Sequence, residues 1–225
     1  MSQELNPVSS DGTENRSALL RRGWTGGVRG NERLTAITGL LLLVLLFIEG
    51  VTLLGIRSLL TVHAFVGLLL IPPIVLKLAS TGYRFVRYYT RSRIYRLAGP
   101  PQVILRIAAP FLVLSTVVLF GTGVILLIAG PAARDVWRPL HTVCFFVWFW
   151  PMTVHVVAYV WRVPGLALAD LRLQPDGRVA RTPVGGLTRQ GLVLGTFLLG
   201  LTIAIAAMPL DASWVHWLSR LGTEG

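Results

Sequence analysis

The sequence predicts an all-α integral membrane protein with five spanning helices. Of its 225 residues, 53% are hydrophobic and only 14% are charged, and the mean hydropathy is +0.66. This much apolar surface is typical of a protein that lies in a bilayer. Five apolar segments each approach the roughly 20 residues that a spanning helix needs: 34–54, 59–78, 104–128, 137–161 and 190–208.

The arginines predict how these spans are oriented. Five lie in the N-terminal tail, five in the loop after the second span and five in the loop after the fourth span. In a five-span protein these three segments share one face, whereas the other face has only Arg57, Arg134, Arg138 and Arg220. The positive-inside rule therefore places the N-terminus in the cytoplasm and the C-terminus outside.

We expect five parts along the chain. Residues 1–34 lack sustained periodicity and predict a disordered cytoplasmic tail without a signal peptide. Residues 35–162 predict a four-helix bundle, 163–189 a cytoplasmic loop, 190–208 a fifth transmembrane helix and 209–225 an outer tail. Within the loop, a turn signal at 174–177 predicts a small hairpin over 171–179, which serves as a plain connector or docks a partner.

Charge and cysteine content exclude several classes of site. A net charge of +11 would suggest nucleic acid in a soluble protein, but these arginines flank membrane spans. The segment 84–96, where aromatic residues lie among five arginines, predicts a belt on anionic membrane lipid rather than a nucleic-acid surface. Cys144 is the only cysteine, so an internal disulfide is impossible and any metal site must rely mainly on histidine.

Histidines recur at one spacing inside two of the spans. His141 and His155 are fourteen residues apart, as are His63 and Lys77. Fourteen helical steps return a side chain to within roughly 40° of its start, about 21 Å further along the axis. Because the second and fourth spans run in the same direction, His63 should meet His141 at one depth and Lys77 should meet His155 at another. Ionisable groups at such depths are functional candidates, and imidazole is a common iron ligand.

A helix with two histidines fourteen residues apart, opposite a helix with a matching one, resembles the bacterial di-haem cytochrome b superfamily. This superfamily includes the membrane cytochrome subunits of formate dehydrogenases and nickel-iron hydrogenases. The resemblance covers roughly residues 35–162 and implies a bundle that holds two haem b groups stacked across the bacterial cytoplasmic (inner) membrane. It makes His63, His141 and His155 the axial ligands.

Lys77 departs from this pattern, because a full second pair would need histidine there. It is the only lysine beside twenty arginines. Either its neutral amine ligates the inner haem opposite His155, or its side chain snorkels to the interface or pairs with a haem propionate. The histidines also have a plain alternative, which is hydrogen bonding between helices.

Other positions are weaker candidates. Arg57 and Arg138 lie at the outer ends of the ligand-bearing helices and could pair with haem propionates or anchor the interface. Gly67, together with Gly39, Gly121 and Gly123, could make room for haem or simply pack helices closely. Glu49 is a candidate proton acceptor at a quinol site, but we expect it to face the membrane interface.

The resemblance implies electron transfer between a quinone pool and a peripheral oxidoreductase, with a molybdenum enzyme as one candidate partner. We expect an electron-transfer subunit rather than a stand-alone enzyme, because no nucleotide-binding fingerprint or acidic metal cluster is present. One alternative keeps only the outer haem. Another is a haem-free membrane scaffold or small transporter with an intramembrane His/Lys network.

Overall fold

The computed structural model describes residues 27–90, 103–161, 163–168 and 185–223. All regular structure in these ranges is helical, and five helices are long and apolar enough to cross a membrane. The predicted all-helical, multi-pass class is thus confirmed at that level. The hairpin predicted over 171–179 and most of the predicted tail 1–34 lie outside the described residues.

The helices follow the five predicted apolar segments, with short helical pieces between some of them. Their bounds are α2 Gly27–Thr52, η1 Leu53–Gly55, α3 Leu60–Tyr89, α5 Val103–Ala129, η2 Pro131–Ala133, α6 Arg134–Tyr159, α7 Val163–Leu168 and α8 Gly186–Thr223.

Most spanning helices extend beyond the apolar segments that predict them. α2 begins seven residues before the predicted start at 34, and α3 continues through Arg84 and Arg87 to Tyr89. α8 runs through Pro209 to Thr223, so the described part of the predicted outer tail is helical. Hydropathy marks only the apolar part of a helix, and the backbone hydrogen bonds of a helix continue into more polar surroundings.

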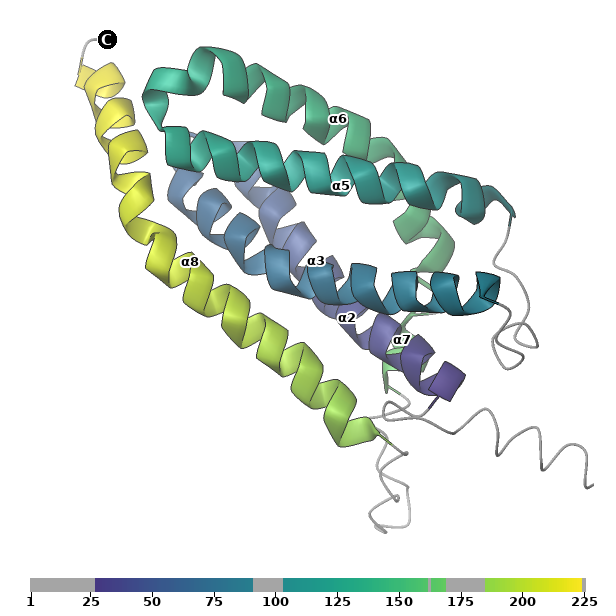
Figure 1. Ribbon diagram of the computed structural model, residues 1–225. Helices are drawn as coiled ribbons and strands as arrows, with labels where there is room; N and C mark the ends of the chain where they lie inside the picture. The colour runs from purple at the N-terminus through teal and green to yellow at the C-terminus, as the bar shows by residue number, and fades with distance from the viewer. Residues whose placement is uncertain (1–26, 91–102, 162, 169–184, 224–225) are drawn as a thin grey trace, which may run out of the picture.

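Two antiparallel hairpins, α2–α3 and α5–α6, form the bundle, and they meet mainly through α3 and α5 (Figure 1). α8 packs along the side of α3 and also touches α2 and α5. The turn between α5 and η2 is tight, with Gly130 at φ 69°, a backbone conformation that glycine adopts without strain. α3 is therefore the central helix, in contact with every other spanning helix except α6, to which it is not closely packed.

Polar contacts hold α2 against α3 near the start of α2. Asn31 Nδ2 donates to the Ser80 carbonyl at 3.0 Å, and the hydroxyls of Thr35 and Ser80 are 3.1 Å apart. Glu32 and Arg84 form an ion pair at 3.2 Å. Because a mispaired polar group inside an apolar interface is costly, these bonds specify the register of the hairpin.

α3 and α8 cross closely at Leu69 and Gly200. Pro73 has no N–H, so the Leu69 carbonyl four residues earlier lacks its usual helical partner. Gly200 of α8 lies against this carbonyl, and a Cβ on residue 200 would overlap it. Leu69 and Leu70 belong to the apolar core, which also contains Ala204 of α8. Proline in one helix and glycine in the other thus permit the close crossing.

Substituting Gly200 by alanine should destabilise the protein relative to Gly195→Ala in the same helix, where nothing lies within 4 Å of an added Cβ. Both changes share the helix-propensity gain, so their difference isolates the overlap with Leu69, which we expect to cost about 1–3 kcal/mol. Thermal unfolding of the detergent-solubilised variants, followed by tryptophan fluorescence, measures this difference. Equal midpoints would contradict the described crossing.

Candidate functional site

His63 of α3 and His141 of α6 lie together inside the bundle. Their ring centroids are 6.4 Å apart and their planes are inclined at 79°. α3 and α6 do not pack closely against each other, so the contact between the two hairpins at this level is made by side chains. The structure therefore brings together the pair that the spacing predicts at one depth.

A threonine from the neighbouring helix holds each imidazole at Nδ1. Thr52 Oγ1 of α2 is 3.0 Å from His63 Nδ1, and Thr122 Oγ1 of α5 is 3.1 Å from His141 Nδ1. Each hydroxyl also donates its only proton to a carbonyl of its own helix, Thr52 to Glu49 at 2.6 Å and Thr122 to Leu119 at 2.8 Å.

These bonds determine which ring nitrogen carries the proton. A threonine hydroxyl has one proton to donate and two lone pairs that accept. Because both protons are already donated to carbonyls, the hydroxyls must accept from Nδ1–H of His63 and His141. In each neutral ring Nε2 then keeps an unprotonated lone pair. A hydrogen-bonded Nδ1–H opposite such a lone pair is the arrangement that ligating histidines usually show.

The separation of the rings suits two ligands of one metal ion. An imidazole nitrogen lies about 2 Å from a transition metal that it binds, and the ring centre lies about 1 Å behind that nitrogen. Two imidazoles on opposite sides of one ion therefore have centroids about 6 Å apart, close to the 6.4 Å observed.

Glu49 of α2 adds a carboxylate to this pair. We expected Glu49 to face the membrane interface, but its side chain is 17% exposed and its Oε1 lies 3.0 Å from His63 Nδ1. Its Oε2 is buried and has no hydrogen-bond partner among the described residues. Thr52 Oγ1 and Glu49 Oε1 thus share the single Nδ1–H of His63, and a carboxylate at this proton makes Nε2 a stronger metal ligand.

Glycines on the neighbouring helices leave room for the side chains of His141 and Glu49. A Cβ on Gly123 would lie 3.1 Å from His141 Cε1, closer than most real contacts, so the ring fits against a bare helix backbone. Gly67 lies beside Glu49, where a Cβ would be at the ordinary distance of 3.4 Å from Oε1. Around Gly121 nothing lies within 4 Å of an added Cβ.

The two arginines proposed as propionate partners lie at the same end of the bundle. Arg57 is exposed in the turn that precedes α3, and Arg138 is exposed on α6 one turn before His141. Their position is compatible with pairing to an anionic group at the mouth of the bundle and with interface anchoring.

Lys77 of α3 and His155 of α6 lie one level further along the helices that carry His63 and His141. Lys77 Nζ donates to the Thr35 carbonyl of α2 at 2.6 Å and lies over Gly39, where a Cβ would be only 2.7 Å away. His155 of α6 packs against Tyr159, with ring centroids 5.0 Å apart. The amine therefore lies in a socket between α2 and α3.

Sequence reasoning missed Thr52 and Thr122, which orient the two imidazoles. In the described part of the chain, no three His, Cys, Asp or Glu side chains are grouped to hold a bare metal ion. Two imidazoles suit instead a metal whose other positions a macrocycle fills.

No family model, curated protein or solved structure matches this chain significantly. Its function therefore has to be inferred from its own residues and their geometry.

Replacing Gly39 by alanine should push Lys77 Nζ off the Thr35 carbonyl and remove a hydrogen bond worth about 1 kcal/mol. Gly50→Ala is the control, because nothing lies within 4 Å of a Cβ at that position of α2. A double-mutant cycle with Lys77→Met, measured by thermal unfolding, should abolish the penalty at Gly39. If the penalty persists beside methionine, Lys77 does not occupy this socket.

Proposed function

We propose that this chain is a b-type cytochrome of a bacterial cytoplasmic membrane that transfers electrons between a quinone pool and a partner oxidoreductase. In this proposal His63 and His141 ligate haem through Nε2, one from each side. The observation that carries it is the pair of threonines, Thr52 and Thr122, that accept from Nδ1–H and leave both Nε2 lone pairs available for ligation.

In this proposal the protein would bind the haem, orient its ligands and surround it with apolar side chains. Bound haem supplies one-electron redox chemistry. His63 and His141 would both hold the haem iron and leave no open position on it, which favours electron transfer over oxygen binding. Glu49 and Thr52 fix the ring of His63, and Thr122 with Gly123 fixes the ring of His141. Most other side chains of these helices are apolar, which would give the site a low dielectric.

Whether the chain holds one haem or two depends in this proposal on whether Lys77 and His155 ligate a second one. If the amine of Lys77, which donates to the Thr35 carbonyl in the structure, ligated a second haem together with His155, the chain would hold two haems. If Lys77 keeps its proton, it supplies a buried positive charge for a propionate, and His63 with His141 forms the single haem site. Haem stoichiometry separates the two arrangements.

The arginine-rich loops suggest which end of the bundle faces the cytoplasm. By the positive-inside rule they favour a cytoplasmic Lys77 end of the bundle and an outer His63 end. We propose that a peripheral dehydrogenase or reductase, such as a molybdenum enzyme, exchanges electrons with the bundle, as the resemblance to the di-haem cytochromes implies.

A haem-free scaffold or small transporter is the rival function. In that case the same threonine contacts would only link helices, and Lys77 and His155 would form a polar relay. The haem content of the purified protein distinguishes this rival from the cytochrome.

Alanine at His63 or at His141 should each abolish the haem that this pair holds. Haem b per polypeptide, measured as the pyridine haemochrome, should fall to zero if the wild type holds one haem and to about half if it holds two. His216→Ala, on the exposed surface of α8, is the matched control and should keep the wild-type content. Wild-type haem content in both histidine variants, with the protein still inserted in the membrane, would contradict the assignment of His63 and His141 as ligands.

Adding a methyl group at Gly123 should displace the ring of His141 by a few tenths of an ångström without removing the ligand. Because ligand orientation tunes the metal, we expect the reduced α-band of Gly123→Ala to shift or broaden and haem retention to fall severalfold. Gly121→Ala, two residues earlier on the same helix, should match the wild type. Identical spectra for both variants would argue against haem next to His141.

A further inference from the structure

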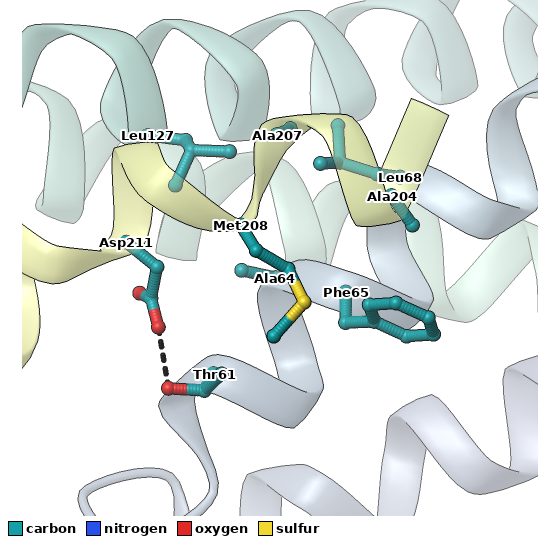
Figure 2. Close-up of a pocket in the computed structure, with 9 residues that line it drawn as sticks. All are labelled: Thr61, Ala64, Phe65, Leu68, Leu127, Ala204, Ala207, Met208 and Asp211. Carbon is teal, nitrogen blue, oxygen red and sulfur yellow. Dashed lines mark hydrogen bonds between the residues drawn. The ribbon is translucent and has the colours of Figure 1, made fainter. Parts of the chain in front are cut away.

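A groove between α3 and α8 has one polar end, and that end contains a buried carboxylate. Figure 2 shows Asp211 of α8 and Thr61 of α3 joined by a hydrogen bond at one side of a pocket with otherwise apolar walls. The hydroxyl of Thr61 donates to Asp211 Oδ2. Asp211 is only 6% exposed, and its Oδ1 is buried without a hydrogen-bond partner among the described residues.

An unpartnered carboxylate oxygen at this position favours a ligand that donates a hydrogen bond. Leaving a buried acceptor unsatisfied costs about 1–3 kcal/mol, and more when it is charged. Thr61 satisfies one oxygen but has no second proton to offer. A hydroxyl group on a lipid-soluble molecule would supply the missing donor, whereas a carbonyl group, which only accepts, would not.

The walls of the groove suit a flat apolar ring once one side chain moves. Ala64, Ala204 and Ala207 have small side chains that let the two helices lie close together, and Phe65 and Leu127 add apolar surface. Met208 lies across the groove and is 50% exposed (Figure 2). With Met208 in this position, the enclosed space is about the size of one water molecule. Methionine has three rotatable bonds and adapts readily, so its displacement would open the groove to lipid.

The groove lies on the opposite side of α3 from the histidine pair. Thr61 precedes His63 by two residues, and two helical steps turn a side chain by about 200°. Thr61 accordingly faces α8, while His63 faces α6 inside the bundle. A ligand in the groove would be separated from the His63 site by about the thickness of one helix, roughly 10 Å.

We propose that Asp211 and Thr61 form the polar end of a binding site for the hydroxyl head group of a membrane-soluble quinol, with Asp211 Oδ1 accepting from the quinol O–H. Oxidation of the bound quinol rests on the proposed cytochrome function, whereas binding of the quinol does not depend on it. Because the site presents an acceptor, it prefers the quinol to the quinone.

The test uses the full chain in lipid nanodiscs, with decyl-substituted benzoquinol under reducing conditions and the corresponding quinone as probes. Equilibrium binding should be about tenfold tighter for the quinol, as expected for one hydrogen bond to a charged group. Asp211→Asn should weaken quinol binding by about tenfold or more, because its amide can turn N–H donors into the groove, and should leave quinone binding equal or stronger. Asp135→Asn, at a side chain that is 80% exposed, is the control and should bind like the wild type.

A second pair of variants keeps the test valid if Asp211→Asn does not fold. Ala207→Leu fills the groove without touching the carboxylate and should weaken binding of both probes, whereas Ala206→Leu, on the exposed neighbouring position, should not. If Asp211→Asn, Ala207→Leu and their controls all bind the quinol as the wild type does, Asp211 only joins α8 to α3 and the proposal is overturned.

Haem content, measured on the same samples, separates the two proposals. Loss of quinol binding in Asp211→Asn with haem retained supports the site. Haem-free wild-type protein that still binds quinol through Asp211 would overturn the cytochrome function and leave the quinol site standing.

Discussion

An imidazole inside an apolar helix bundle needs a partner for its polar nitrogens, and this requirement organises the structure. His63 and His141 each direct Nδ1 to a threonine of the adjacent helix, and each threonine has already donated its proton to its own backbone. The hydroxyls can therefore only accept. One consequence is structural, because the bonds tie α3 to α2 and α6 to α5. The other is chemical, because both rings are left with an unprotonated Nε2.

A polar side chain also finds a backbone partner further along α3, where Lys77 contacts α2. Lys77 Nζ donates a hydrogen bond to the Thr35 carbonyl and lies over Gly39, as the ring of His141 lies over Gly123. At Gly200 the absent side chain admits a backbone carbonyl of α3 instead. In each case a missing Cβ lets a polar group approach a helix backbone, which is how membrane bundles obtain close packing without a hydrophobic driving force between helices.

The sequence predicts the parts that depend on spacing along one helix. Apolar segment lengths locate all five spanning helices, and the fourteen-residue interval places His63 beside His141. Contacts that depend on how helices cross could not be predicted. Threonine in a helix usually bonds to its own backbone, and nothing local marks Thr52 or Thr122 as an acceptor from another helix. The contact of Glu49 with His63 also depends on how two helices pack, so the expected interface position was wrong. Asp211 was missed because the apolar segment that predicts α8 stops at residue 208, before this residue.

The central claim is that His63 and His141 are two axial ligands of one haem. Near-infrared magnetic circular dichroism of the oxidised wild-type protein tests it most directly, because the low-spin charge-transfer band reports the chemical identity of the axial pair. We predict a bis-imidazole band, accompanied by a separate imidazole–amine band if Lys77 ligates a second haem. Protein purified without haem after haem-supplemented expression, or haem that shows only a high-spin signal, would contradict the assignment.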